Sequence, residues 1–183
     1  MDIHTVWTVQ NNGETDIAMS VKLNEEFPEL PRFGIRLFLD KSLDTVTYYG
    51  IGPYESYKDK CRAGSHGLYS DNILNMHEDY IKPQENGSHC DCDYVTVENK
   101  THGVTAVSNK AFSFNASVYT QEELTAKKHN YELVPCESSV LCLDYAQNGI
   151  GSNSCGPRLE KEYRLDEKEF CFEMKLIPST RDS

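Results

Sequence analysis

The chain has 183 residues, of which 29 are acidic and 18 basic, and its formal net charge at pH 7 is -11. A chain of this length can bury about 70% of its unfolded surface, which is enough for one large hydrophobic core. The acidic balance, with no cluster of Lys and Arg, argues against a nucleic-acid partner. No stretch approaches the roughly 20 apolar residues that span a bilayer, so we expect neither a membrane anchor nor an export signal.

The predicted elements are mostly strands, because apolar and polar residues alternate with a period of two. The clearest segments are residues 5–9, 16–23, 34–39, 45–51, 94–99 and 112–118, and further strands are expected at 131–135, 139–145, 159–165 and 169–177. Turn signals separate them, such as Asn12-Gly13 and Asn148-Gly149. One short helix is predicted near residues 121–128, because Thr120 and Glu123 form a capping box. Residues 52–92 and 146–158 read as long functional loops.

This pattern predicts a single all-β domain over residues 1–183, built as an antiparallel sandwich. Strand patterning begins at Ile3, with no turn or cap before it. We therefore expect a sandwich that is N-terminally incomplete and that carries an unpaired strand edge.

The seven cysteines are an odd number in a chain that is large enough to fold without disulfides. We expect mostly free thiols and a reducing, cytoplasmic location. Cys90 and Cys92 lie beside His89 and Asp91, which invites a zinc interpretation. On a regular strand these two pairs face opposite sides, so we expect no metal site and inward-facing cysteines.

Three motifs, in order and spacing, resemble the C-terminal domain of glycoside hydrolase family 2 β-galactosidases. They are YYGIGPYESYKDK at residues 48–60, YIKPQENGSHCD at 80–91, and FSFNASVYTQEEL at 112–124 with LDYAQNGIGSNSCGP at 143–157. The resemblance covers about residues 5–177. It implies an antiparallel β-supersandwich, similar in fold to galactose mutarotases, whose N-terminal strands are missing from this chain.

The resembled enzymes hydrolyse terminal β-D-galactosides such as lactose with retention, and they use two glutamates as nucleophile and acid/base. Those glutamates belong to a barrel upstream of the matching region, and the divalent-cation and sodium sites of the family also lie outside it. The resemblance thus implies no catalytic residue, metal ligand or cofactor in this chain. It implies two partners, the catalytic barrel of the same parent enzyme and a β-galactoside substrate, and it implies that the parent is a homo-oligomer.

The segment at residues 149–157 resembles a loop that reaches the rim of the active site. One bacterial member of the family presents a tryptophan there to the aglycone sugar, and here Cys155 stands at that position. Asn153, Ser154 and Cys155 are therefore the implied contacts on the aglycone side. Gly149, Gly151 and Asp144 are expected to support the loop, and we expect Asp144 to accept backbone N–H groups.

Other readings of the motif residues remain open. Glu55 is expected to fix a long loop through hydrogen bonds, and Glu85 to belong to turn chemistry. The alternative function is a stand-alone carbohydrate-binding module, with a sugar-stacking face among Tyr48, Tyr49, Tyr54, Tyr57, Tyr69 and Tyr80. A third reading, mutarotase-type catalysis, requires a His/Glu pair that the spacing does not indicate.

Overall fold

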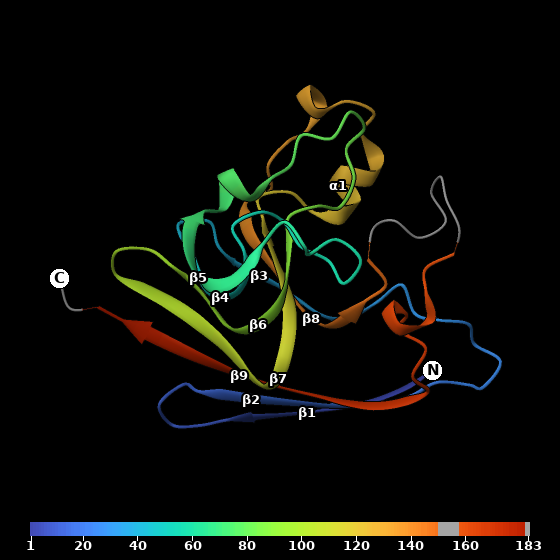
Figure 1. Cartoon of the computed structure of the whole chain (residues 1–183). Helices are drawn as coiled ribbons and strands as arrows, with labels where there is room; N and C mark the ends of the chain where they lie inside the picture. Colours follow the sequence, from blue (N-terminus) through green and yellow to red (C-terminus); the bar gives the residue numbers. More distant parts are fainter. Residues whose placement is uncertain (150–157, 182–183) are drawn as a thin grey trace.

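The computed structural model describes residues 1–149 and 158–181, and this part of the chain is mostly antiparallel β-sheet (Figure 1). Its strands are β1 (Asp2–Val9), β2 (Thr15–Lys22), β3 (Arg32–Asp40), β4 (Thr45–Gly52), β5 (Ser65–Asn72), β6 (Ser88–Glu98), β7 (His102–Ser117), β8 (Ser138–Gln147) and β9 (Glu169–Thr180). The helix α1 spans Gln121–Ala126, and short 3-10 turns lie at η1 (Ile73–Met76), η2 (Asn130–Glu132) and η3 (Lys161–Tyr163). The all-β prediction is confirmed. None of the described helices has the length and apolar character to cross a membrane.

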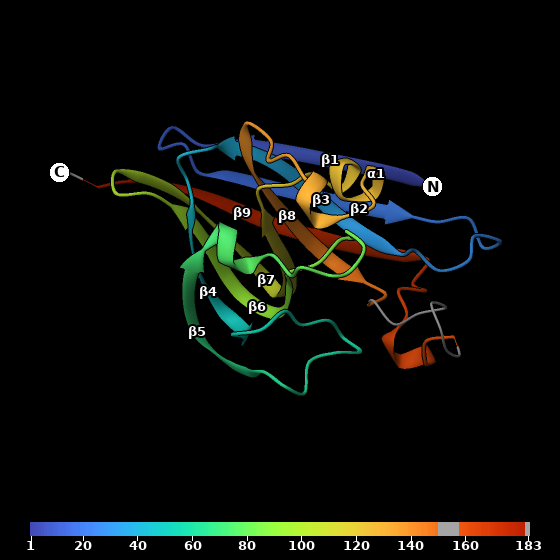
Figure 2. The same cartoon turned by 90° about the horizontal axis from the view of Figure 1, so that it is seen from above.

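The long strand β7 joins the two layers of the sandwich. Its first half pairs with β9 and its second half with β8, while β6 follows both halves. One layer therefore continues from β7 through β9 and β2 to β1, and the other through β8 to β3. Strands β4 and β5 continue the sheet beyond β6. Figures 1 and 2 show β1, β2 and β9 as one layer against the remaining strands.

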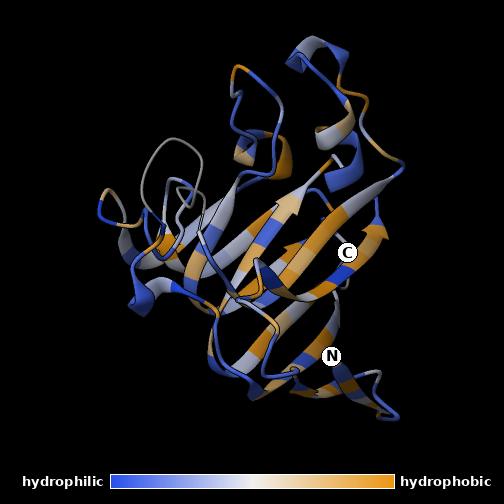
Figure 3. Cartoon of the chain, turned by 90° about the vertical axis from the view of Figure 1, so that its right-hand side faces the viewer, coloured by the Kyte–Doolittle hydropathy of each residue, from blue (hydrophilic) through white to orange (hydrophobic). Residues whose placement is uncertain are grey.

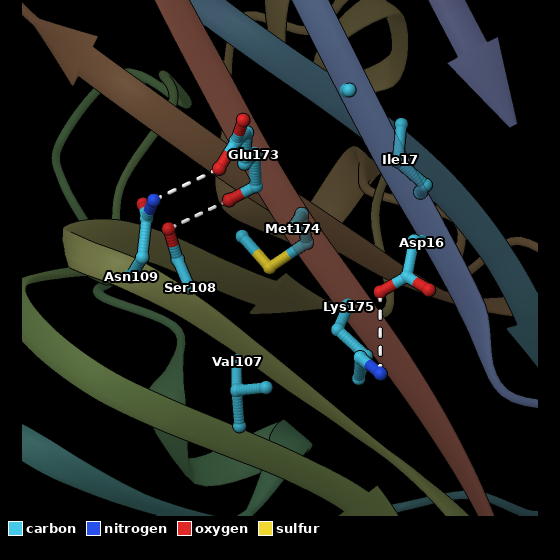
Figure 4. Close-up of a pocket in the computed structure, with 9 residues that line it drawn as sticks. Asp16, Ile17, Val107, Ser108, Asn109, Glu173, Met174 and Lys175 are labelled. Carbon is cyan, nitrogen blue, oxygen red and sulfur yellow. Dashed lines mark hydrogen bonds and ion pairs between the residues drawn. The ribbon is translucent and has the colours of Figure 1, made fainter. Parts of the chain in front are cut away.

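Side chains replace the backbone ladder where β7 separates from β9 (Figure 4). Ser108 Oγ donates to the Glu173 carbonyl at 2.7 Å, and Asn109 Nδ2 donates to the Glu173 carboxylate at 2.9 Å. Lys175 pairs with Asp16 at 3.3 Å and so links β9 to β2 beside the fork. Because diverging strands leave backbone groups without ladder partners, these contacts stabilise the fork around a cavity of about 440 Å³.

The core lies between the two layers, and Phe170 of β9 joins them. Its ring stacks on Tyr145 of β8 at a centroid distance of 4.5 Å and meets Phe33 of β3 edge-on at 5.1 Å. Along β2 the inward side chains Ile17, Met19 and Val21 are buried, and the residues between them are exposed. Figure 3 shows the same banding of apolar and polar residues along the strands, in contrast to the polar loops.

Strand β1 stands at the outer edge of its layer and is exposed along all 8 residues. It pairs with β2 alone, with Ile3 opposite Val21 and Trp7 opposite Ile17. Directly opposite residues in an antiparallel pair share a face, so Ile3 and Trp7 extend the core face of β2 into solvent. The expected open strand edge is therefore present among the described residues.

Two of the strands predicted from the sequence are wrong. Residues 131–135 hold the end of η2, with Tyr131 85% and Val134 63% exposed, and residues 159–165 hold η3. Both segments alternate, but neither pairs with a described strand, and the second makes only an isolated bridge from Leu165 to Leu30. The segment 52–92 is also not one loop, because it contains β5, η1 and the start of β6.

The short helix is confirmed in place, with one difference in its capping. Thr120 Oγ1 accepts a hydrogen bond from the Glu123 backbone N–H at 3.1 Å, as expected for an N-cap. The Glu123 side chain instead accepts from the Val134 N–H at 2.9 Å. The helix thereby holds the loop that follows it.

The regular alternation assumed for His89 to Cys92 is wrong. The register against β7 shifts on both sides of Cys92, and Asp91 has a φ of 55°. This bulge buries His89, Cys90 and Cys92 together. Even so, no group of three His, Cys, Asp or Glu side chains among the described residues could hold a metal ion. The cysteines that the structure describes are free thiols.

The glycine pair Gly50 and Gly67 offers a test of how tightly β4 packs against its neighbour β6. The two residues face each other across β4 and β5. A Cβ at Gly50 would overlap the Cys92 sulfur and lie 3.1 Å from the Cys92 Cα, whereas a Cβ at Gly67 would meet Tyr69 at an ordinary 3.4 Å. We expect Gly50→Ala to lower the free energy of unfolding by about 1–3 kcal/mol, because backbone must shift. Gly67→Ala should change it by less than about 0.5 kcal/mol.

Urea denaturation of both variants measures these two free energies. Equal losses for the two substitutions would contradict the packing described at Cys92.

Candidate functional site

The first two motifs meet at a buried carboxylate, that of Glu55, whose side chain is 3% exposed. One oxygen accepts from Lys60 Nζ at 2.6 Å and from the Tyr80 hydroxyl. The other accepts from the Gly87 N–H at 2.8 Å and from the Tyr57 hydroxyl at 3.3 Å. Burial opposes ionisation, but the hydrogen bonds from Lys60 and Tyr80 outweigh it and lower the pKa of Glu55. The expectation that Glu55 fixes a long loop is confirmed.

The second motif is tied in turn to β7 through its Asn-Gly turn. Gly87 has a φ of 71°, a left-handed conformation that favours glycine. The Asn86 side chain accepts from the Glu78 N–H at 2.9 Å and donates to the Gln84 carbonyl at 2.9 Å. Asn115 of β7 donates to the Asn86 carbonyl. These bonds bring the second and third motifs into contact.

A second buried carboxylate, that of Asp144 on β8, lies across from the start of β3. Arg32 donates to it through two nitrogens, at 2.7 and 2.6 Å, and the Asp144 side chain is 2% exposed. Burial raises the pKa of Asp144, and the bidentate contact with Arg32 opposes that shift. Glu85 of the second motif also pairs with Arg32. This cluster is called the Arg32 cluster below.

The Arg32 cluster corrects two expectations. Asp144 accepts from an arginine side chain, with no backbone N–H donor among the described residues, and Glu85 serves an ion pair in addition to its turn. Arg32 is 112 positions from Asp144 in the chain. No local signal in the sequence reveals this partner, and it was missed for that reason.

The segment that leads into residues 150–157 is anchored by Asn148 on both sides. Asn148 donates its backbone N–H to the Pro31 carbonyl at 2.9 Å and accepts from the Leu165 N–H at 2.6 Å through its side chain. Gly149 has a φ of 78°, and a Cβ there would overlap the Asp59 carboxylate. Gly149 therefore lets the chain pass close to the first motif. Gly151, Asn153, Ser154 and Cys155 lie outside the described residues.

The two buried carboxylates at this end of the sandwich hold its loops together. In residues 1–149 and 158–181 the buried carboxylates of Glu55 and Asp144 are each held by a cation. All acceptor positions of Glu55 point at donors that are already in place. A carboxylate held in this way fixes loops and does not exchange protons with a ligand.

A comparison with protein-family models identifies one match, described as "Beta galactosidase small chain", which covers residues 1–176. A β-galactosidase of Actinobacillus pleuropneumoniae is 47% identical over 171 residues, which make up 93% of this chain and 17% of that protein. A β-galactosidase of Staphylococcus xylosus is 39% identical over 173 residues, with the same two shares. One of Kluyveromyces lactis is 33% identical over 167 residues, 90% of this chain and 16% of that protein. The chain thus spans about a sixth of the length of these relatives.

The two arginines of β3 give a matched test of the Arg32 cluster. Arg32→Ala would leave the buried Asp144 carboxylate without its cation, so we expect the free energy of unfolding to fall by about 3–5 kcal/mol. Arg36 pairs with Glu122, whose side chain is 68% exposed. Arg36→Ala should therefore cost less than about 1 kcal/mol.

Chemical denaturation at neutral pH compares the two variants. Equal free energies of unfolding for the Arg32 and Arg36 variants would show that the Arg32 cluster does not stabilise the fold.

Proposed function

The chain belongs to the β-galactosidase small-chain family, and from this we propose that it is the non-catalytic C-terminal part of a retaining β-galactosidase. The nucleophile and acid/base glutamates come from a barrel elsewhere in the parent enzyme, which hydrolyses terminal β-D-galactosides such as lactose. This chain packs on that barrel and adds one loop to the rim of the active site. The observation that carries the proposal is the match of nearly the whole chain to about a sixth of each relative.

The open side of the sandwich supports a docking role. Strands β1 and β3 are the outermost strands of the two layers, both on the side away from β7. On β1, Ile3 is 47% and Trp7 52% exposed, on a face continuous with the core. An exposed apolar edge strand is an aggregation hazard that proteins normally cover. We propose that the rest of the parent enzyme covers it.

The rim loop is the proposed link to catalysis. Its entry is fixed by Asn148 and by the passage of Gly149 beside Asp59. Asn153, Ser154 and Cys155 then contact the leaving group of the galactoside through their polar atoms, directly or through water. Cys155 offers no aromatic face, so this enzyme holds the aglycone sugar by hydrogen bonds.

The proposal extends to the location, the ion sites and the oligomeric state of the parent enzyme. We propose a cytoplasmic location, in keeping with the free thiols of the described cysteines. We also propose that the divalent cation and sodium ion of the parent are bound outside this chain, and that the parent is a homo-oligomer.

The single tryptophan of the chain makes assembly measurable. The isolated chain should not hydrolyse o-nitrophenyl β-galactoside. Mixed with the catalytic portion of its parent, it should restore hydrolysis. When that portion carries no fluorescent tryptophan, the emission of Trp7 should shift to shorter wavelength on mixing, because the side chain leaves water. Trp7→Glu should weaken assembly at least tenfold, because it places a charge in an apolar contact.

Tyr131→Glu is the matched control, because Tyr131 is 85% exposed and lies outside the open side. Hydrolysis by the isolated chain, or assembly that is indifferent to Trp7→Glu, contradicts the proposal.

A second experiment addresses the rim loop in the assembled enzyme. Cys155→Trp adds a stacking face for the leaving sugar, so the KM for lactose should fall by up to about tenfold. The KM for methyl β-galactoside should stay within about twofold, because a methyl group has no ring to stack. Steady-state kinetics with the two substrates measures both KM values. Equal changes for the two substrates would place Cys155 away from the aglycone.

A further inference from the structure

A second cavity, of about 270 Å³, lies beside β4 and β5 and is lined by residues outside 150–157. Its walls include Tyr48, Tyr54, Tyr69, Asp71, Glu78 and His89. Its volume equals that of about nine water molecules. It therefore has room for one small ring and not for a chain of sugars.

Two buried side chains that line this cavity each have one polar atom without a hydrogen-bond partner among the described residues. His89 is 3% and Tyr48 2% exposed, and their rings pack at a centroid distance of 4.5 Å. Among the described residues neither His89 Nε2 nor the Tyr48 hydroxyl forms a hydrogen bond. Among the described residues, the only side-chain polar atoms that are both fully enclosed and without a partner are His77 Nε2 and Asn130 Oδ1. His89 Nε2 and the Tyr48 hydroxyl are therefore not fully enclosed, and both residues line the cavity.

The protonation state of His89 is set by its other nitrogen. Nδ1 lies 3.2 Å from the Ile51 carbonyl, which can only accept, so Nδ1 carries the proton. Burial lowers the pKa of His89 to about 4, and the ring is neutral near pH 7. Nε2 is then a free hydrogen-bond acceptor on a residue that lines the cavity.

The ligand must therefore both donate and accept hydrogen bonds. His89 Nε2 needs a donor, and the exposed carboxylate of Glu78 is free to accept, whereas the Tyr48 hydroxyl is free to donate and needs an acceptor. Asp71 uses one oxygen for Asn75 Nδ2 and the Asn72 N–H, both at 2.7 Å, and its other oxygen accepts no hydrogen bond from the described residues. Sugar hydroxyls meet both needs. An ammonium ion cannot accept from Tyr48, and an anion would meet two carboxylates.

Aromatic faces complete the match. Tyr54 is 64% exposed and lines the cavity, so its ring is available to stack on the C–H face of a pyranose. Tyr69 packs beside Tyr48 at a centroid distance of 5.5 Å and forms part of the inner wall. Glu55 also borders the cavity, but its oxygens are occupied by their own donors.

We propose that this cavity binds a single neutral pyranose, stacked on Tyr54 and hydrogen-bonded to Tyr48 and His89. It is an accessory sugar site built from the first motif, β5 and the bulge of β6. The proposal depends neither on residues Asn153 to Cys155 nor on the catalytic role proposed for the parent.

The test is a titration of the 183-residue chain with methyl β-D-galactopyranoside and with glucose, followed by amide shifts in NMR. Saturable shifts around Tyr48 and His89, with a Kd in the millimolar range, are expected for at least one of the two sugars. Tyr48→Phe removes one hydroxyl and should raise the Kd about tenfold. Tyr54→Ala removes the exposed stacking face and should raise it about as much.

Matched controls separate these effects from loss of fold. Tyr49→Phe alters the neighbouring tyrosine, which faces the other side of β4, and Tyr131→Ala removes another exposed ring. Both should leave the Kd within about twofold, and thermal melts should match the wild type for all exposed-site variants. The proposal is overturned by a lack of saturable binding, by shifts confined to residues 150–157, by indifference to both Tyr48→Phe and Tyr54→Ala, or by tighter binding of choline than of either sugar.

Discussion

The pairing of β7 with two different strands is the constraint on which the rest of the structure depends. A single strand cannot pair with both β8 and β9 on one side along its whole length. It pairs with β9 over its first half and with β8 over its second half, so the sheet must divide near Ser108. The division places β9 and β2 opposite β8 and β3, and the core is the space between them. Phe170, in contact with Phe33 and Tyr145, fills that space at its closest point.

The same division gathers the motif residues at one end. The second half of β7 carries Asn115 to the Asn86 turn, and β8 carries Asp144 to Arg32. Glu55 closes the arrangement through the Gly87 N–H. Burying a carboxylate without hydrogen-bond donors would cost free energy, so Glu55 and Asp144 each accept from more than one donor group. The result is a hydrogen-bonded base beside the point where the chain leaves Gly149.

The sequence predicted most strands because burial of one face leaves a direct trace in alternation, as at Ile17, Met19 and Val21. It missed β5, whose Ser65–Asn72 segment is largely polar and pairs with β4 alone. It wrongly assigned a strand around Tyr131, because alternation does not reveal whether a neighbouring strand exists to pair with. The loop-fixing role of Glu55 was predictable, since its donors Tyr57 and Lys60 are close in the chain. Arg32 was not, because only the folded sheet brings it to Asp144.

The exposed strand β1 at the open side of the sandwich links the stability of this chain to its assembly with the proposed parent. Ile3 and Trp7 lie on a face that the second layer does not cover, although the neighbouring residues of β2 are fully buried. A partner that covers β1 would remove this apolar surface from water and would bind the folded sandwich in preference to the unfolded chain. Such binding adds its free energy to the stability of the fold. Folding of the sandwich and its assembly with the rest of the proposed enzyme are then linked through one strand, while Asn148 and Gly149 hold the chain where it enters residues 150–157. In the proposed enzyme this segment belongs to the rim of an active site whose acid, base and nucleophile come from the rest of the parent.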